Sequence, residues 1–414
     1  MSEGESSSMR KAEALALDWF EARAGQVKDR LIELGVKEAI LVHHDDADGL
    51  ASAAATKKAL EGLGLRVKSI CLEKLFPSVV RALHSGSEQA IFYCDIGSPH
   101  ADLISRANNG RNLTVILDHH DPRPASDPSV LDLNLEHAGL RGEEDFSGST
   151  VCYLFARALD EANRRLSYLA LVGSCEIPVG FKGLNAQVLE EALSDGVVER
   201  VKKKLVIKAL GIGVKELFSM LQVLGPVGYY RGGPELGIKA CLEGPTAEVR
   251  ELAKALEEER KAANKRLLAR LYRRGLRRSG RIQWFDAGDA YEGMGAKVIG
   301  TFCSYLSYQR KLVRQDAFVI GLMRLRPEVP GFGRLEGDFV KVSVRAPKGL
   351  RADIDAGRAP TAVRLLEEAT AGFGIAVDGH AYAASCIIPA DKVDEFVERA
   401  ARASSRPGGQ MTLG

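Results

Sequence analysis

The sequence of 414 residues lacks closely spaced cysteines. Its seven cysteines are scattered along the chain, their number is odd, and none stands in a Cys-x-x-Cys pair. This spacing argues against a disulfide framework and against a zinc knuckle. We therefore expect free cysteines and a protein that resides in the reducing cytoplasm.

Long apolar runs and a strong charge of one sign are also missing. No stretch approaches the roughly 18 consecutive apolar residues of a membrane-spanning helix, and the first residues lack the basic-then-apolar order of a signal peptide. The formal net charge is only +2, so any affinity for nucleic acid must come from local basic patches. The sequence therefore predicts a soluble protein without a membrane partner.

Strands and helices alternate along the first part of the chain. After a predicted disordered start at residues 1–9, helical spacing runs from Arg10 to about Leu34. Apolar, β-rich runs follow at residues 38–44, 66–72, 89–95, 113–118 and 130–134. Further helices are expected to begin near Gly49, Ser98 and Ser149. This alternation predicts a doubly wound α/β domain with a mostly parallel sheet, in which ligands bind beyond the carboxyl ends of the strands.

The rest of the chain divides into a helical middle and a second α/β region. Residues 184–281 are predicted to form a helical, basic connector, with ten lysines and arginines and no acid from Arg260 to Arg281. Such a block is either the solvated face of a linker helix or a surface that follows phosphates, and both interpretations remain open. Residues 282–404 are predicted to form a smaller α/β domain, and residues 405–414 a flexible tail. Strands are expected in this smaller domain at 281–287, 317–325, 339–347 and 384–390, and helices at 295–308, 353–372 and 391–403.

Ionisable side chains follow three of the predicted strands of the first domain. These side chains are His44, Asp46, Asp48, Asp95, Asp118, His119 and His120. Because the carboxyl ends of parallel strands meet at one edge of a sheet, we expect them to crowd together there. Without a partner they would repel each other and lose solvation, whereas a divalent cation would supply the missing charge. Carboxylate and imidazole ligands together suit Mn²⁺, Fe²⁺ or Zn²⁺ better than Ca²⁺.

A calcium loop and a purely structural role fit these residues less well than a metal centre. A calcium loop of the EF-hand type would need an acid at position 44 and Glu at position 55, but those residues are His44 and Ala55. Any single cluster could consist of helix-capping and core residues. Three clusters at the ends of successive strands favour a metal centre.

The ordered motifs HxDxDG, DxG and DHH resemble those of the DHH phosphoesterases. The stretches VKVSVRAP (340–347) and DGHAYAAS (378–385) resemble the Ser-x-Arg strand and the GGHxxAAG motif of the DHH-associated C-terminal domain. The resemblance covers nearly the whole chain, with the DHH domain at residues 10–183. The most similar subgroup is that of the archaeal RecJ-like proteins, relatives of bacterial RecJ and of the RecJ-derived subunit of the eukaryotic replicative helicase.

The resemblance implies a two-metal site, occupied by Mn²⁺ or by Mg²⁺ or another divalent ion. One ion would be held by His44, Asp46 and Asp95. The other would be held by Asp48, Asp95 and His119, so that Asp95 bridges the two. In the catalytic machinery Asp118 would orient a histidine and His120 would approach the scissile phosphate. The second domain would bind the substrate through Ser343, Arg345, Gly379 and His380. Arg345 would bind phosphate bidentately.

The chain departs from the family pattern at two motifs. Where the family usually has ALVGxxGD, this sequence reads ALVGSCEIPVG, which places Ile177 at the position of the last metal ligand. Glu176 precedes it and is the tentative replacement ligand. In the second domain Asp378 and Ser385 stand where glycines are usual.

Three functions fit these motifs. The leading one is a metal-dependent exonuclease on single-stranded DNA or RNA in replication or repair. The second is a catalytically weakened scaffold that binds replisome or helicase proteins, which the missing aspartate favours. The third is a phosphodiesterase of short oligonucleotides or cyclic dinucleotides, and the basic helical middle favours a polymer over these small substrates.

Overall fold

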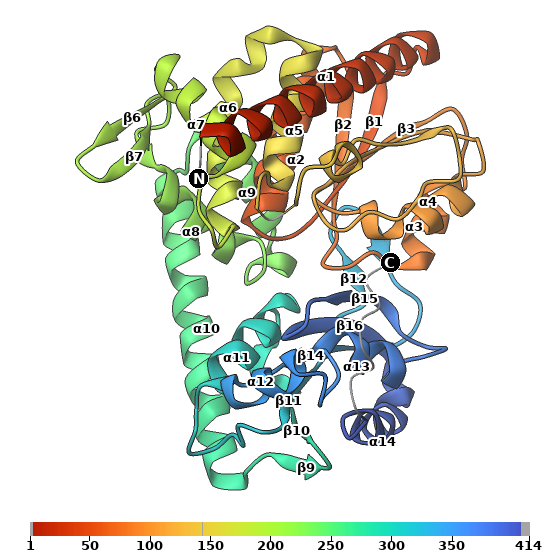
Figure 1. The fold of residues 1–414 in the computed structure, drawn as a ribbon, viewed down its shortest axis with the longest axis vertical. Coiled ribbons are helices and arrows are strands. Elements are labelled where there is room, and N and C mark those ends of the chain that lie inside the picture. Colours follow the sequence, from red (N-terminus) through yellow and green to blue (C-terminus); the bar gives the residue numbers. More distant parts are fainter. Residues whose placement is uncertain (1–2, 143, 407–414) are drawn as a thin grey trace. The chain divides into compact units, whose positions relative to one another are not determined.

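The computed structural model describes residues 3–142 and 144–406, and the side chains from residue 11 onward (Figure 1). Two compact units are present. The first unit comprises the residues up to 253 together with 329–333, and the second unit comprises 254–328 and the residues from 334 onward. The predicted domain boundaries at residues 183 and 281 stay predictions. In the described part of the chain no helix is long and apolar enough to cross a membrane.

A five-stranded parallel sheet forms the centre of the first unit. Its strands are β1 (Glu38–His43), β2 (Arg66–Cys71), β3 (Ala90–Cys94), β4 (Leu113–Leu117) and β5 (Val130–Asp132). They are arranged in the order β2-β1-β3-β4-β5, and every neighbouring pair is parallel. All five strands lie where the sequence predicts them, and the α/β fold class is confirmed.

Helices of the first unit pack on this sheet or on one another. They are α1 (Glu3–Leu34), α2 (Ala47–Gly62), α3 (Pro77–Leu83), α4 (Ala101–Asn108), α5 (Gly148–Leu159), α6 (Ser167–Gly173) and α7 (Gly183–Ser194). Every residue of β3 and β4 is buried, as expected for parallel strands that are covered on both faces. Helix α2 is buried over its first ten residues, because its run of alanines lets it pack closely against both α5 and α6. This close packing holds the start of α2 against the end of β1.

Helix α1 begins at Glu3 instead of Arg10. Residues 3–9 are therefore helical and not disordered as predicted, since no proline interrupts the stretch before Arg10. The first two residues of the predicted disordered start lie outside the described residues. The same holds for the predicted flexible tail from residue 407 onward.

The middle of the chain is mostly helical, as predicted, but it also contains a small antiparallel sheet. The helices are α8 (Val214–Leu224), α9 (Gly233–Glu243) and α10 (Ala247–Arg274). The sheet consists of β6 (Val198–Val201), β7 (Lys204–Ile207) and β8 (Ile212–Gly213). The tight connection between β6 and β7 contains Lys202 at a φ of +56°. Hairpin turns with a positive φ usually contain Gly or Asn, and here the residue is a lysine within a basic stretch. The sequence therefore carries no signal for this hairpin.

A six-stranded mixed sheet forms the second unit, in the order β15-β16-β14-β11-β10-β9. Its strands are β9 (Arg277–Ser279), β10 (Ile282–Asp286), β11 (Phe318–Arg324), β14 (Phe339–Arg345), β15 (Ile375–Gly379) and β16 (Ala383–Pro389). A separate short pair is formed by β12 (Glu328–Val329) and β13 (Gly333–Arg334). The helices are α11 (Lys297–Ser307), α12 (Lys348–Asp355), α13 (Ala362–Ala369) and α14 (Val393–Ala403).

One helix prediction for the second unit is wrong. The single helix expected at 353–372 is two helices, α12 and α13. Gly357 adopts a φ of +66° and Pro360 follows it, so the helix cannot continue through this stretch. Short 3-10 helices complete the described chain: η1 (Ser98–His100), η2 (Leu135–Ala138), η3 (Glu161–Leu166), η4 (Ser174–Glu176), η5 (Tyr229–Arg231), η6 (Gly288–Tyr291) and η7 (Ala390–Lys392).

Candidate metal centre

The predicted ionisable clusters meet at the carboxyl edge of the parallel sheet. Strands β1, β3 and β4 are neighbours and run in the same direction, so the residues that follow them gather at one edge. Two groups of side chains each bring one potential ligand atom per residue within 4.8 Å of the others. Asp95, which follows the middle strand β3, belongs to both groups.

The first group consists of His44, Asp46 and Asp95. Nδ1 of His44 lies 2.6 Å from Oδ2 of Asp46 and 3.8 Å from Oδ2 of Asp95. The other oxygen of Asp46 accepts a hydrogen bond of 2.9 Å from the backbone N–H of Gly49 and so caps helix α2. A Cβ at Gly49 would lie 2.5 Å from the carbonyl oxygen of His44, which explains the glycine of the HxDxDG motif.

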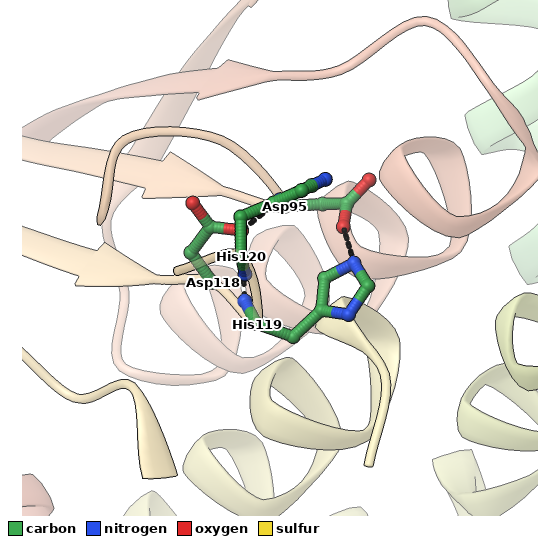
Figure 2. Close-up of side chains that lie close together, drawn as sticks. All are labelled: Asp95, Asp118, His119 and His120. Atoms are coloured by element: carbon green, nitrogen blue, oxygen red, sulfur yellow. Dashed lines mark hydrogen bonds and ion pairs between the residues drawn. The ribbon is translucent and has the colours of Figure 1, made fainter. Parts of the chain in front are cut away.

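The second group consists of Asp95, Asp118, His119 and His120 (Figure 2). Nε2 of His119 lies 3.3 Å from Oδ1 of Asp95. Asp95 has a φ of +59°, a left-handed conformation that is uncommon outside glycine and is concentrated at functional sites. This turn directs the Asp95 carboxylate to a place where both groups can use it.

Asp118 is a fully buried hub that fixes the orientation of His120. Its carboxylate accepts hydrogen bonds from the backbone N–H groups of Ser98 at 2.9 Å and His119 at 2.8 Å. Its Oδ1 also lies 2.7 Å from Nδ1 of His120. Burial opposes ionisation of both groups, but their mutual attraction outweighs this cost. The attraction lowers the pKa of Asp118 and raises the pKa of His120 to about 9. The half-exposed His120 ring is thus held through its Nδ1 by the buried Asp118 carboxylate.

Asp48 is present at the edge, but its carboxylate is already used by helix α5. Its two oxygens accept hydrogen bonds from the backbone N–H groups of Gly148 at 3.0 Å and Ser149 at 2.9 Å, at the positive end of that helix. Nε2 of His119 lies 3.8 Å from Oδ2 of Asp48. Asp48 is therefore close to His119 but outside the two groups of potential ligand atoms.

The structure does not bring Glu176 to the cluster. Its side chain is exposed and accepts a hydrogen bond of 2.8 Å from Gln222. The stretch is not the strand or loop that the sequence suggested: α6 ends at Gly173, and η4 turns Ser174 inward while Glu176 faces out. Ile177 is buried and carries no ligand atom. Glu176 therefore does not take the place of the missing aspartate in this structure.

The donor set fits a divalent cation. Burial, and then the neighbouring carboxylates of Asp48 and Asp46, raise the pKa of Asp95 well above its usual range. Oδ1 of Asp95 and Nδ1 of His119 are buried without a hydrogen-bond partner in the described part of the chain. Buried, mutually repelling carboxylates beside an imidazole are costly alone and become favourable around a cation. The residues present thus suit Mn²⁺ or a similar ion.

Sequence reasoning missed several groups that support this edge. Asp45 is buried and its Oδ1 lies 3.4 Å from Nε2 of His44, on the other side of the ring from Asp46. Metal-binding imidazoles usually have such a carboxylate behind them, and the run His44-Asp45-Asp46 carried that signal. Gly173 was missed as well: a Cβ there would lie 2.0 Å from Oδ1 of Asp48. No local pattern could reveal that approach, because it joins segments far apart in the chain.

In the second unit, Ser343 and Arg345 lie on one face of β14, next to helix α11. Ser343 is buried and its hydroxyl has no hydrogen-bond partner in the described residues. The half-buried Arg345 guanidinium donates through Nε to Ser304 at 2.8 Å and through Nη1 to the carbonyl oxygens of Val344 and Ala384. Burial lowers the pKa of Arg345. Among the described residues only its Nη2 is left without a partner, so the expected bidentate grip on phosphate would require rearrangement.

The two unusual residues of the last motif form a pair. Asp378 of β15 and Ser385 of β16 are opposite each other in the antiparallel register, and the Ser385 hydroxyl donates to Oδ1 of Asp378 at 3.1 Å. Gly379 adopts a φ of +137°, and a Cβ there would lie 2.4 Å from the backbone of Ala383. The glycine is thus needed by the hairpin itself and not only by an approaching ligand. His380 follows it and is exposed.

Comparisons with known proteins agree with the strand-end motifs. Residues 38–173 match the family model of the DHH family, N-terminal domain. An uncharacterized protein of Methanocaldococcus jannaschii is 30% identical over 152 residues, which cover 33% of this chain and 34% of that protein. The aligned part therefore spans about a third of that relative's length.

Solved structures with the same fold cover nearly the whole chain. RecJ of Thermus thermophilus in complex with Mn²⁺ is 18% identical with a TM-score of 0.61, and the match covers 92% of this chain and 54% of that one. Exonuclease RecJ bound to manganese is 19% identical with a TM-score of 0.59, covering 94% and 95%. CDC45 from Entamoeba histolytica is 9% identical with a TM-score of 0.56, covering 94% and 99%. At such identities the likeness is one of fold, and the chain spans about half of the Thermus protein. The predicted resemblance is confirmed: residues 38–173 match the N-terminal domain of the DHH family, in a chain with the fold of RecJ and CDC45.

Proposed function

We propose that this protein is a metal-dependent phosphodiesterase, and that it acts as an exonuclease on single-stranded DNA or RNA in replication or repair. The observation that carries the proposal is the position of Asp95, which joins two groups of potential ligands at the carboxyl edge of the sheet. Metal-dependent phosphoesterases use such a shared carboxylate to hold two cations close together. The RecJ structures of the same fold contain Mn²⁺, in keeping with this choice of ion.

In this proposal His44, Asp46 and Asp95 hold one Mn²⁺ or Mg²⁺ ion. Asp48, Asp95 and His119 hold the other, with the Asp48 carboxylate shared with the start of α5. When bound, the ions supply a water of lowered pKa and neutralise charge on the phosphate. Asp45 fixes the far side of the His44 ring and keeps its Nδ1 directed at Asp46 and Asp95.

The chain itself supplies a positioned proton donor. Asp118 holds the His120 ring through Nδ1, so the Nε2–H of His120 is the group that meets a phosphate oxygen. The charged form of His120 is stabilised by the buried Asp118 carboxylate, which makes the ring a hydrogen-bond donor at neutral pH. Asp118 is thus a positioning residue, and His120 is the residue that touches substrate.

The second unit is proposed to bind the nucleic-acid backbone. Arg345 is half-buried without an ion-pair partner in the described residues, so an anion at its free Nη2 would offset the cost of that burial. Ser343 offers an unused hydroxyl on the same face of β14. Gly379 and His380 lie on the adjoining hairpin and are proposed as further substrate contacts.

A catalytically weakened scaffold is the second candidate. Ile177 stands where the family has a metal ligand, and Glu176 faces away toward Gln222. One ion would then have one protein ligand fewer than usual. In that case the chain would serve replisome or helicase proteins as a binding partner and would cleave slowly or not at all.

A cleavage assay separates these candidates. Purified protein is incubated with Mn²⁺ and end-labelled single strands of DNA and of RNA, a duplex, and a dinucleotide. We expect stepwise shortening of a single strand, and its loss in Asp95→Asn. Asp102→Asn is the matched control, because Asp102 is an acid of the same unit that only pairs with Arg106. Metal uptake without cleavage of any substrate would overturn the nuclease and leave the scaffold. Cleavage of the dinucleotide alone would restrict the activity to small substrates.

A further inference from the structure

The second unit exposes three tyrosines close together. Among the large hydrophobic side chains that are exposed in the described chain, the aromatic ones are Tyr272 at 48%, Tyr305 at 48% and Tyr308 at 68% exposure. Tyr272 lies near the end of α10, and the other two lie at the end of α11. The hydroxyl of Tyr272 donates to Oε1 of Gln309 at 3.3 Å, and the N–H of Tyr308 donates to the carbonyl of Tyr305. Gln309 therefore links Tyr272 of α10 to the end of α11, where Tyr305 and Tyr308 lie three residues apart.

One of these rings, that of Tyr305, rests on buried aromatic residues. Tyr305 packs against the fully buried Phe302, with ring centroids 6.3 Å apart. Phe302 in turn contacts Phe285 of β10 at 5.7 Å. On α10 the neighbouring Leu271 is buried. An aromatic side chain on such a base loses little conformational entropy when another flat group stacks on it, since only two side-chain torsions need ordering.

A block of unpaired cations accompanies the tyrosines. Several basic residues of this region do have partners: Arg260 and Lys261 pair with Glu257, and Arg270 donates to backbone carbonyls. The remaining ones are exposed and form no hydrogen bond or ion pair through their side chains within the described residues. They are Lys265, Arg266, Arg273, Arg274, Arg277, Arg278, Arg310 and Lys311. A block of like charges without acids is unfavourable unless it faces anions.

We infer that this tyrosine–arginine surface, formed by Tyr272, Tyr305 and Tyr308 with the eight unpaired cations, binds single-stranded nucleic acid. Bases would stack on the tyrosine rings and phosphates would contact the cations, the combination that sequence-independent single-strand binding uses. A duplex keeps its bases stacked internally and would meet only the cations. Of the two interpretations of the basic stretch 260–281, this inference favours a surface that follows phosphates over a solvated face of a linker helix.

This inference takes its ligand class from the proposed function, but the binding does not involve the metal centre. All its residues belong to the second unit. Binding can therefore be measured with the metal removed, where no cleavage occurs. A protein partner or a second copy of the chain would also use exposed tyrosines and arginines, so the test must separate these occupants.

The test measures fluorescence anisotropy of labelled oligothymidylate and oligouridylate in EDTA, over a range of salt concentrations. The triple variant Tyr272→Ser, Tyr305→Ser, Tyr308→Ser should bind about tenfold more weakly for each ring that stacks. The matched control carries Phe at the same three positions, which keeps the stacking faces and should bind like the wild type. Arg273→Gln with Arg274→Gln should reduce the salt slope by about 1 for each phosphate that is no longer neutralised. Quenching of tyrosine fluorescence by the bound strand should disappear in the Ser variant.

Three results would overturn the inference. Equal affinity of the wild type and the Ser variant would remove the tyrosines from the binding surface. Equal affinity for duplex and single strand would leave only charge attraction. A dimer in sedimentation that the Ser variant loses, with unchanged oligonucleotide binding, would assign the surface to a second copy. Single-strand binding without cleavage in Mn²⁺ would contradict the proposed nuclease but not this surface. Cleavage by a protein whose single-strand affinity is the same in the wild type and the Ser variant would support the nuclease and contradict this surface.

Discussion

The two units each bury charge that the described chain does not balance, but of opposite sign. At the carboxyl edge of the first sheet, Asp46, Asp48 and Asp95 crowd together and raise the pKa of Asp95. On β14 of the second sheet, Arg345 is half-buried among a hydroxyl and carbonyl oxygens, with no carboxylate at ion-pair distance in the described residues. Uncompensated burial of either sign is costly. This contrast supports the proposal that the first unit binds a cation and the second an anion.

The two sites also differ in how their chains are fixed. In the first unit the candidate ligands follow strand ends and are held by helix starts: Asp46 caps α2, and Asp48 accepts hydrogen bonds from the first N–H groups of α5. In the second unit Ser343 and Arg345 lie inside a strand, and their side chains are placed by the pleat of β14. Substitutions should therefore disturb the first site through orientation and the second mainly through charge.

Among substitutions that keep the shared carboxylate of Asp95, the largest effect is expected from Asp118→Asn. An amide cannot accept all the hydrogen bonds that the carboxylate accepts from Ser98, His119 and the His120 ring, so His120 loses its orientation and its charge. We expect cleavage to slow by about 10–100-fold, as is usual for groups that support a metal-site histidine. The alkaline limb of the rate profile should move to lower pH, because Asp118 raises the pKa of His120. The cleavage rate is measured against pH. An unchanged profile would show that Asp118 does not set the pKa of His120 during cleavage.

Next in size is Gly173→Ala. The backbone at Gly173 is helical, so alanine is tolerated by its torsion angles, but the added Cβ would lie 2.0 Å from Oδ1 of Asp48 and 2.1 Å from Oγ of Ser149. Such overpacking costs about 1–3 kcal/mol and should displace Asp48. Thermal unfolding with and without Mn²⁺ should show a lower Tm and a smaller stabilisation by the metal. Gly25→Ala in α1 is the control, since nothing lies within 4 Å of its Cβ position.

A smaller effect is expected from Arg345→Ala in the second unit. Removing this cation should weaken oligonucleotide binding and lower the salt slope by about 1, without altering Mn²⁺ uptake. Arg364→Ala removes an exposed cation of the same unit that only pairs with Glu368, and serves as the control. An Arg345 variant with the affinity and salt slope of the wild type would show that Arg345 on β14 does not bind phosphate. It would contradict the proposal that the second unit binds an anion where the first binds a cation.

The smallest effect is expected from Glu176→Gln. Glu176 is exposed and hydrogen-bonds Gln222, so removing its charge should leave both the Mn²⁺ dependence of cleavage and the Tm nearly unchanged, within about 0.5 kcal/mol of stability. Cleavage is measured across Mn²⁺ concentrations. Loss of activity that high Mn²⁺ restores would show that Glu176 turns inward and completes the second ion's ligands, contrary to its place here.

The clustering of the first candidate site could be predicted from the sequence because its determinants are local. Apolar runs mark the parallel strands, and the residues right after them must share an edge, so His44, Asp95 and His119 could be grouped from the strand pattern alone. The same reasoning failed for Glu176, because a 3-10 turn rotates it away from the edge. It also failed for Asp378 and Ser385, two departures from the family pattern that compensate each other across a hairpin. Such pairings depend on register and not on spacing.

The proposed function depends on a metal centre at the carboxyl edge of the first sheet, and titration calorimetry of Mn²⁺ tests this proposal most directly. The metal-stripped wild type is compared with Asp95→Asn, and with Asp102→Asn as the control. We expect saturable uptake by the wild type and the control, and a loss of uptake in Asp95→Asn, because both ligand groups share Asp95. Without metal, Asp95→Asn should also unfold at a higher temperature, since one buried repelling charge is gone. No uptake by the wild type, or equal uptake by wild type and Asp95→Asn, would contradict a metal centre at this edge.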